Sequence, residues 1–184
     1  IPVKIQQRRI IVERPEHFLA VIDQLNSTEA HDYTAWYHLH PDLILGKSTQ
    51  TRLKVSDNEG AVLCQIQSYD SDSNSLNCEE IRGETVPELQ GWFSENGKEL
   101  IPNSAIGFRF QTASTIVTVF DFHMKKTGKP YLKVGTGGKY IRFALTQAEK
   151  KFDMRLKFGE KILDTIEIEL DGQKTETTIE FKGD

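Results

Sequence analysis

RRIIVERPEHFLAVIDQL, residues 8–25, is the stretch that predicts the fold most directly. Its apolar residues form two clusters, at 10–12 and at 18–22, and Pro15-Glu16 lies between them as a turn signal. Two short apolar runs on either side of a turn are typical of a β-hairpin. We therefore expect two antiparallel strands near the start of the chain.

The rhythm of short strands and turns continues along the rest of the chain. TIVTVFDF, residues 115–122, has continuous apolar content and indicates a central strand. The last third alternates apolar residues with lysine and glutamate, and Asp171-Gly172 is a hairpin signal within it. Only residues 87–90 and 147–151 are candidates for short helices. The sequence therefore predicts an all-β fold, a two-sheet antiparallel β-sandwich of about a dozen strands.

Length and composition fit a single domain that covers residues 1–184. The net charge of −4 and the pI near 5.8 argue against a nucleic-acid partner, which usually requires a basic face. No apolar run approaches the roughly 20 residues of a spanning helix, so no membrane span is expected. The chain opens at Ile1-Pro2 without an initiator methionine or a signal-peptide pattern, which favours a piece of a longer protein.

Cys64 and Cys78 are the only cysteines in the sequence. Their spacing is not C-x-x-C, so they form neither a zinc ribbon nor a redox motif. They could form a disulfide on neighbouring strands in an oxidising compartment, or remain as two free thiols. Both alternatives stay open at this stage.

The densest cluster of reactive side chains is AWYHLHPDLIL, residues 35–45. In an extended strand His38 and His40 would point to the same face, where two imidazoles could share a metal ion. Two histidines are too few for a tetrahedral zinc site. The alternative is that both are polar residues on the wet face of an edge strand that ends at Pro41.

Three aromatic residues are candidates for stacking against a sugar ring: Trp36, Tyr37 and Trp92. Tryptophan is on average highly buried, so packing in the core is the alternative for each of them. A catalytic group is harder to find. The sequence has no G-x-S-x-G elbow, and no pair among its many carboxylates can be selected without geometry. The residues alone therefore propose no catalytic centre.

Four stretches taken together resemble a known family. They are RRIIVERPEHFLAVIDQL at 8–25, WYHLHPDLIL at 36–45, GWFSENGKELIPNSAIGFRF at 91–110 and STIVTVFDF at 114–122. In this order and spacing they are similar to the C-terminal β-sandwich domain of heparinase II/III-like polysaccharide lyases. The most specific marks are HLHPD at 38–42 and GWFS at 91–94. The similarity extends to about Phe122, and the later strands match only as generic sandwich edges.

The resemblance implies a two-part enzyme that cleaves uronic-acid polysaccharides by β-elimination. In the family a helical toroid holds much of the substrate cleft, and most catalytic residues lie there or in an H-N-T segment at the start of the sandwich. This chain contains neither part, so its catalytic residues are expected outside it and the chain alone is expected to be inactive. The sequence leaves open whether the chain is an enzyme in its own right.

Some members of the family hold a structural zinc ion with two histidines and an aspartate. His38 or His40 matches one of these histidine positions, and the other ligands would precede Ile1. The resemblance therefore implies zinc in the full-length protein and no cofactor in this chain alone.

The resemblance also implies partners and a location. The expected partners are an acidic polysaccharide and the helical toroid of the same polypeptide, and the parent is expected to be extracellular, on the cell surface or periplasmic. The face that meets the toroid should carry an apolar patch, with Trp36, Tyr37 or Trp92, and this patch could drive dimerisation. The alternative function is a non-catalytic carbohydrate-binding β-sandwich module, and a third is a structural adhesin domain.

Overall fold

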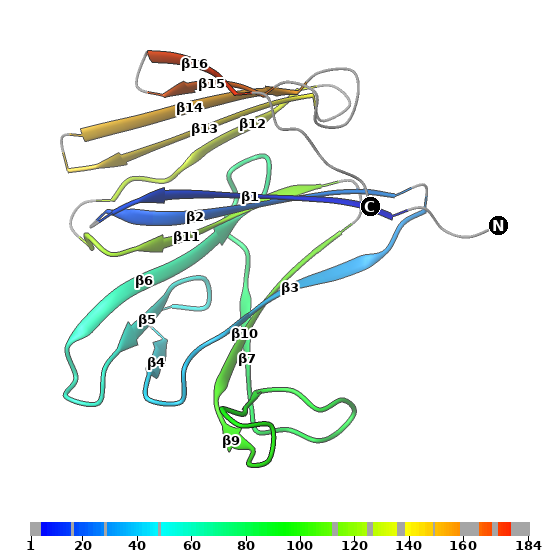
Figure 1. Cartoon of the computed structure of the whole chain (residues 1–184), viewed down its shortest axis with the longest axis vertical. Helices are drawn as coiled ribbons and strands as arrows, with labels where there is room; N and C mark the ends of the chain where they lie inside the picture. Colours follow the sequence, from blue (N-terminus) through cyan, green and yellow to red (C-terminus); the bar gives the residue numbers. More distant parts are fainter. Residues whose placement is uncertain are drawn as a thin grey trace.

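The fold is a stack of antiparallel β-sheets (Figure 1). A computed structural model describes residues 5–15, 17–27, 29–47, 49–111, 114–124, 127–135, 139–148, 150–158, 166–170 and 173–177. These residues form sixteen strands in four sheets. The prediction of an all-β chain is confirmed.

The central sheet has six strands in the order β1-β2-β11-β6-β5-β4. Their bounds are β1 Ile5–Arg14, β2 Phe18–Ser27, β4 Ile44–Lys47, β5 Leu53–Ser56, β6 Val62–Tyr69 and β11 Thr115–Asp121. The predicted hairpin is confirmed, because β1 and β2 pair from Ile5–Ser27 to Arg14–Phe18. The predicted central position of residues 115–122 is also confirmed, since β11 lies between β2 and β6.

Three smaller sheets complete the fold. The small sheet has the order β3-β10-β7, the terminal sheet the order β12-β13-β14-β15-β16, and β8 pairs with β9 as a short ribbon. Their bounds are β3 Asp32–His38, β7 Cys78–Arg82, β8 Trp92–Phe93, β9 Ile101–Pro102, β10 Ser104–Gln111, β12 Tyr131–Val134, β13 Tyr140–Gln147, β14 Lys150–Phe158, β15 Ile166–Leu170 and β16 Gln173–Thr177.

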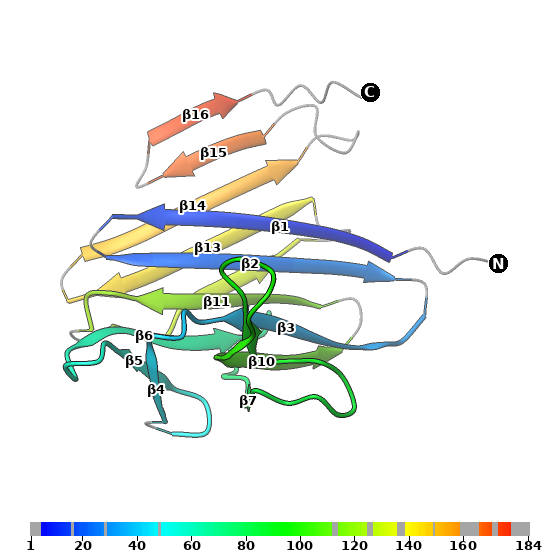
Figure 2. The ribbon, with the colours of Figure 1, turned by 60° about the horizontal axis from the view of Figure 1, so that its bottom comes forward.

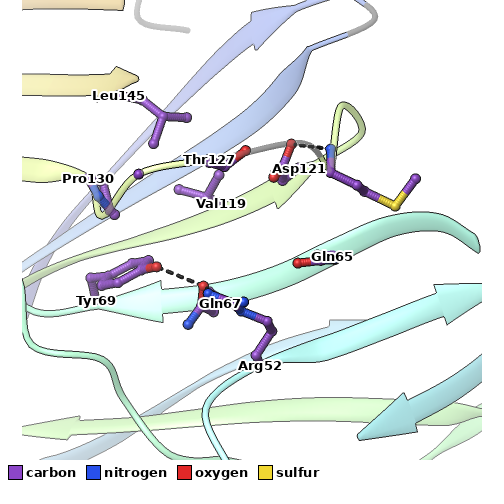
Figure 3. A pocket seen from close by; sticks show the side chains of 11 residues that line it. Arg52, Gln65, Gln67, Tyr69, Val119, Asp121, Thr127, Pro130 and Leu145 are labelled. Carbon is purple, nitrogen blue, oxygen red and sulfur yellow. Dashed lines mark hydrogen bonds between the residues drawn. The ribbon is translucent and has the colours of Figure 1, made fainter. Parts of the chain in front are cut away.

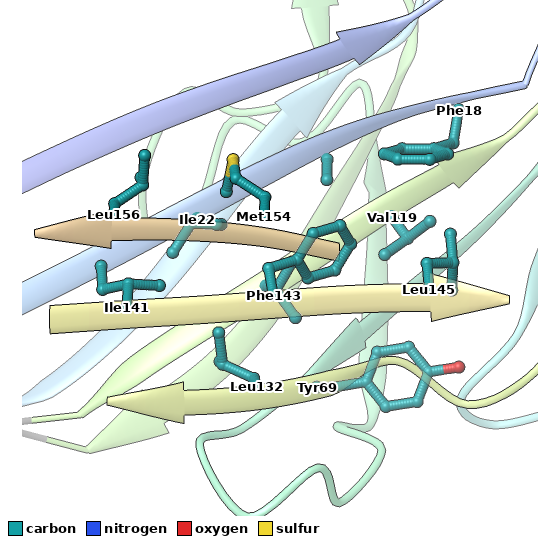
Figure 4. Packing of buried hydrophobic residues seen from close by; sticks show 12 residues of the cluster. Phe18, Ile22, Tyr69, Val119, Leu132, Ile141, Phe143, Leu145, Met154 and Leu156 are labelled. Atoms are coloured by element: carbon teal, nitrogen blue, oxygen red, sulfur yellow. The ribbon is translucent and has the colours of Figure 1, made fainter. Parts of the chain in front are cut away.

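The terminal sheet packs on one face of the central sheet. Alternate residues of β2 and β11 on this face contact inward residues of β12, β13 and β14 (Figure 4). The cluster consists of Phe18, Ala20, Ile22, Tyr69, Val117, Val119, Leu132, Ile141, Phe143, Leu145, Met154 and Leu156. The Phe18 and Phe143 rings meet edge to face, with centroids 5.9 Å apart. Burial of these side chains joins the first and last thirds of the chain.

The small sheet packs on the opposite face of the central sheet. There Phe120 of β11 and Cys64 and Ile66 of β6 meet side chains of β3 and β10, and Figure 2 shows β3 and β10 from a second direction. The buried members of this second cluster are Leu39, Leu53, Val55, Cys64, Ile66, Ile106 and Phe108.

The strands are therefore arranged in three main layers rather than in the two sheets that the sequence predicted. The reason lies in β2 and β11. Ile22 and Val117 face the terminal sheet, while their chain neighbours Val21 and Ile116 are equally buried on the opposite face. A sheet whose inner strands are apolar on both faces must be covered on both faces.

Neither predicted short helix forms among the described residues of 87–90 and 147–151: the first segment lies in a loop, and the second consists of strand ends and Ala148. Residues 84–90 close into a ring, in which Glu84 and Gln90 exchange backbone hydrogen bonds of 3.0 Å. In the second segment Gln147 is the last residue of β13, and it pairs with Lys150, the first residue of β14. Ala148 has a left-handed φ of 52°, which ends regular structure there.

The sequence predicted a turn at 57–60, and this turn is confirmed. The Asp57 carboxylate accepts hydrogen bonds from the backbone N–H groups of Glu59 and Ala61, and Gly60 supplies a φ of +87°. The predicted turn at Asp171-Gly172 lies outside the described residues.

Cys64 and Cys78 are free thiols, and both belong to the cluster between the central and small sheets. Among the described residues, no helix is long and apolar enough to cross a membrane.

Candidate functional site

The candidate residues Trp36 and Tyr37 lie on opposite faces of the small sheet. Tyr37 points toward the central sheet, where its ring contacts Phe108 and Phe120 with centroids 6.2 and 5.3 Å apart. Side chains alternate along a strand, so Trp36 points away from the central sheet. These two aromatics therefore cannot form one common stacking surface.

Tyr37 is a core residue. Its hydroxyl is buried close to Asp23, and burial raises the pKa of Tyr37 to about 12. Asp23 is itself buried, and the Arg9 guanidinium binds it through two hydrogen bonds of 2.6 and 3.2 Å. For Tyr37, packing in the core is therefore the observed role.

Trp36 lies over a glycine of the neighbouring strand. Gly107 pairs directly with Trp36, and a Cβ atom at Gly107 would approach the indole carbons Cη2 and Cζ3 to 2.8 Å. The indole is half-buried. It covers the backbone of β10 with one part and leaves another part accessible to solvent.

The two histidines lie at the end of β3. His38 is the last residue of the strand and is exposed, while His40 lies in the turn that follows. Strand alternation therefore does not extend to His40. The imidazole of His40 meets the Phe93 ring edge to face, with ring centroids 5.1 Å apart. Its Nδ1 lies 3.4 Å from Oδ2 of Asp42. Across the described ranges, no group of three or more His, Cys, Asp or Glu side chains is arranged to hold a metal ion.

Trp92 is held by the loop between β7 and β10. Its Nε1–H donates a hydrogen bond of 2.9 Å to the carbonyl of Glu84, and the indole is half-buried. A Cβ at Gly83 would lie 3.1 Å from Pro102 and 3.6 Å from Trp92, which shows how closely these residues pack. The indole therefore closes the loop.

Residues 38–42 and residues 91–94 meet in space. Besides the contact of His40 with Phe93, Asn103 joins the two stretches from the start of β10. Its side-chain amide donates a hydrogen bond of 2.6 Å to the carbonyl of Leu39, and its backbone N–H donates one of 2.8 Å to the carbonyl of Gly91. Asn103 is 1% exposed, and this role was missed because nothing in its sequence context distinguishes it from a loop asparagine.

A second polar centre that the sequence did not indicate lies at the end of β11. The buried carboxylate of Asp121 accepts hydrogen bonds from the backbone of His123 and Met124 and from the side chain of Gln147. His123, a strand-end histidine, stacks on His17 with ring centroids 5.5 Å apart. The two rings are nearly parallel, 16° apart, so a single metal ion cannot lie in both ring planes.

No family model and no curated protein matches this chain.

Proposed function

We propose that this chain is the C-terminal β-sandwich domain of a heparinase II/III-like polysaccharide lyase and has no lyase activity alone. The observation that carries the proposal is the contact between residues 38–42 and 91–94. These are the stretches with the most specific resemblance to the family, and they are 49 residues apart at their closest ends. Their contact through His40, Phe93 and Asn103 supports a shared role at one end of the small sheet.

In this proposal the chemistry comes from another part of the polypeptide. β-Elimination requires a group that neutralises the uronate carboxylate, a base for the C5 proton and an acid for the leaving oxygen. The helical toroid would supply these groups and bind the acidic polysaccharide, and the present chain would support the cleft. Zinc would bind His38 or His40 only together with ligands outside the chain. The parent protein would be exported or displayed at the cell surface.

An exposed apolar surface next to residues 91–94 supports docking of the toroid. Four large apolar side chains on the loop between β7 and β10 are open to solvent: Val86, Leu89, Leu100 and Ile101. Val86 is 77% exposed and Leu89 is 61% exposed. Several exposed large apolar side chains in one segment favour an interface with a partner. The aromatics Trp36, Tyr37 and Trp92 were expected there, but each is at least half-buried in the folded chain.

The test is a β-elimination assay on the chain alone and on the complete polypeptide that contains it. The assay follows the absorbance of the unsaturated uronide with heparan sulfate, hyaluronan and alginate as substrates. We expect activity only in the complete polypeptide. A substitution Leu89→Glu should lower this activity by disturbing the docked toroid, whereas Ile44→Glu, at a similarly exposed site on β4, should not. An inactive complete polypeptide would contradict the proposal.

A second candidate is a carbohydrate-binding module without catalysis, and one observation favours it. Trp36 presents its indole on the outer face of a sheet, above Gly107, in a position where a sugar ring could stack on it. Retention of the chain on a polysaccharide column, lost on Trp36→Ala and unchanged by Trp92→Phe, together with an inactive complete polypeptide, would support this candidate over the lyase domain.

A further inference from the structure

A polar cavity of about 180 Å³ opens between the central sheet and the terminal sheet (Figure 3). Its volume is several times the roughly 30 Å³ that one water molecule occupies in the liquid. Gln65, Gln67 and Tyr69 of β6 form one wall together with Val119 of the neighbouring strand β11, and Pro130 and Leu145 lie across from them. The cavity faces the terminal sheet, so it lies on the opposite side of the central sheet from the small sheet that carries Trp36.

The wall from β6 is polar where the other face of the same strand is apolar. Residues 65, 67 and 69 alternate with Cys64 and Ile66, which are buried against the small sheet. Oε1 of Gln67 accepts two hydrogen bonds, from Oη of Tyr69 at 2.8 Å and from Nε of Arg52 at 3.3 Å. The oxygen of Gln67 is therefore occupied, and its amide N–H groups are left to donate hydrogen bonds to a ligand. Gln65 adds a second carboxamide beside Gln67.

Thr127 contributes a hydroxyl to the opposite side of the cavity. This oxygen is buried, and within the part of the chain that the structure describes it has no hydrogen-bond partner. A buried polar atom without a partner costs free energy, so a ligand hydroxyl bonded to Thr127 would be favoured.

The two charged residues that line the cavity differ in exposure. Arg52 is exposed and lies at the rim, and Asp121 is 6% exposed and lies at the inner end. One oxygen of Asp121 already accepts three hydrogen bonds, from His123, Met124 and Gln147. Its negative charge excludes a second anion from the inner end, whereas the Arg52 guanidinium can bind a carboxylate through paired hydrogen bonds.

We propose that this cavity binds one sugar acid. Its carboxylate lies against Arg52, and its hydroxyl groups bond to Gln65, Gln67 and Thr127. Carboxamides and hydroxyls both donate and accept, which matches the hydroxyl groups of a sugar. Val119, Pro130 and Leu145 contact the apolar C–H edge of the ring. The cavity is argued from its own residues, and only the choice of a sugar acid over another hydroxy acid rests on the proposed function.

Isothermal titration calorimetry of the chain with D-glucuronate, D-glucose and L-glutamine tests the proposal. We expect glucuronate to bind, and glucose to bind at least roughly tenfold more weakly because it cannot form the charge-assisted bonds to Arg52. Arg52→Gln should weaken glucuronate binding by a similar factor and leave glucose binding unchanged. Arg109→Gln is the matched control, because it removes the same charge from the outer face of the small sheet.

A second pair of variants tests the hydroxyl contacts. Gln65→Leu and Thr127→Val should each weaken both sugars, and urea unfolding of each variant shows that it remains folded. Absence of glucuronate binding, glucuronate binding that Arg52→Gln does not change, or preference for glutamine over glucuronate would each overturn the proposal. The proposed function is tested separately: lyase activity of the complete polypeptide without glucuronate binding contradicts only the cavity, and binding without lyase activity contradicts only the lyase.

Discussion

The side-chain amide of Gln147 donates a 2.7 Å hydrogen bond to the carboxylate of Asp121 and thereby links the terminal sheet to the central sheet. Gln147 is 2% exposed and Asp121 is 6% exposed. The same Asp121 oxygen also accepts from the backbone N–H groups of His123 and Met124 and fixes the chain where it leaves β11. Because these groups are buried, removal of one hydrogen-bond partner leaves the remaining polar groups without a hydrogen bond from the protein or from water.

The first prediction concerns this carboxylate. Asp121→Ala should lower the free energy of unfolding by about 2–4 kcal/mol, because three donors lose their acceptor. Asp121→Asn retains one acceptor oxygen and should lose less. Urea unfolding measures both changes. The exposed Asp72→Ala is the control and should stay within about 0.5 kcal/mol of the wild type. An Asp121→Ala variant as stable as Asp72→Ala would contradict the assigned role.

The second prediction concerns the support of Trp36. Gly107→Ala would place a Cβ 2.8 Å from Thr34 and from the indole of Trp36, so the indole must move. We expect a loss of stability of about 1–3 kcal/mol and a red shift of the Trp36 fluorescence. A Trp92→Phe background isolates this signal. At Gly46 an added Cβ meets only the carbonyl of Lys54 at 3.9 Å, so Gly46→Ala should change neither property.

The third prediction concerns pH. A hydrogen bond from Arg142 to Asp153, of 2.9 Å at its Nε, holds the pKa of Asp153 below the ordinary value of 3.8. A carboxylate with a lowered folded-state pKa stabilises the fold above its unfolded pKa, and this contribution is lost as the pH falls through the folded-state pKa. Urea unfolding should therefore show that the stability difference between wild type and Arg142→Gln is constant above about pH 5 and shrinks in stronger acid.

The corresponding control is Lys133→Gln on β12, which removes a positive charge from an exposed site. It should show no comparable loss of stability near neutral pH. A wild-type advantage over Arg142→Gln that grows as the solution becomes more acidic would have the wrong sign and would exclude the ion pair as its source.

The fourth prediction concerns the thiols. Burial raises the pKa of Cys64 to about 11, so little reactive thiolate forms at neutral pH. Cys78 is half-buried, and its Sγ donates a hydrogen bond to the carbonyl of Gln50. Iodoacetamide followed by mass spectrometry should show modification of Cys78 before Cys64. Cys64 should react quickly only after unfolding in urea. Fast labelling of Cys64 in the folded Cys78→Ala variant would show that the cluster around it opens.

Local patterns predicted much of the fold. The apolar runs at 10–12 and 18–22 predicted the first hairpin, and the continuous apolar content of 115–122 predicted a central strand, because both signals depend on residues adjacent in sequence. The number of layers could not be predicted in this way. The composition of 115–122 indicated a strand with two buried faces, but which later strands cover each face is set by contacts across more than a hundred residues, such as Phe18 with Phe143.

The candidate site was predicted less well. Trp36 and Tyr37 were both proposed for one exposed apolar patch, and the sequence could not show that Tyr37 is packed between two sheets. The strand alternation did not predict the direction of His40, because β3 ends at His38, two residues earlier. Asn103 and Asp121 were not selected, since their importance comes from buried hydrogen bonds to distant partners. The sequence did contain a weak signal for the cavity: Gln65 and Gln67 place two carboxamides on one face of a strand whose other face carries apolar residues.

The terminal sheet covers one face of the central sheet, and this limits how the chain can be shortened. The first hairpin and the central strand β11 both end before Phe122, which invites an expression boundary just beyond it. Removal of the later strands would remove Leu132, Ile141, Phe143 and Leu145 from their contacts with Phe18, Ile22, Val117 and Val119. The apolar face of the central sheet, now buried, would then be exposed to solvent and prone to aggregation. The smallest unit that folds alone therefore includes the strands that follow β11.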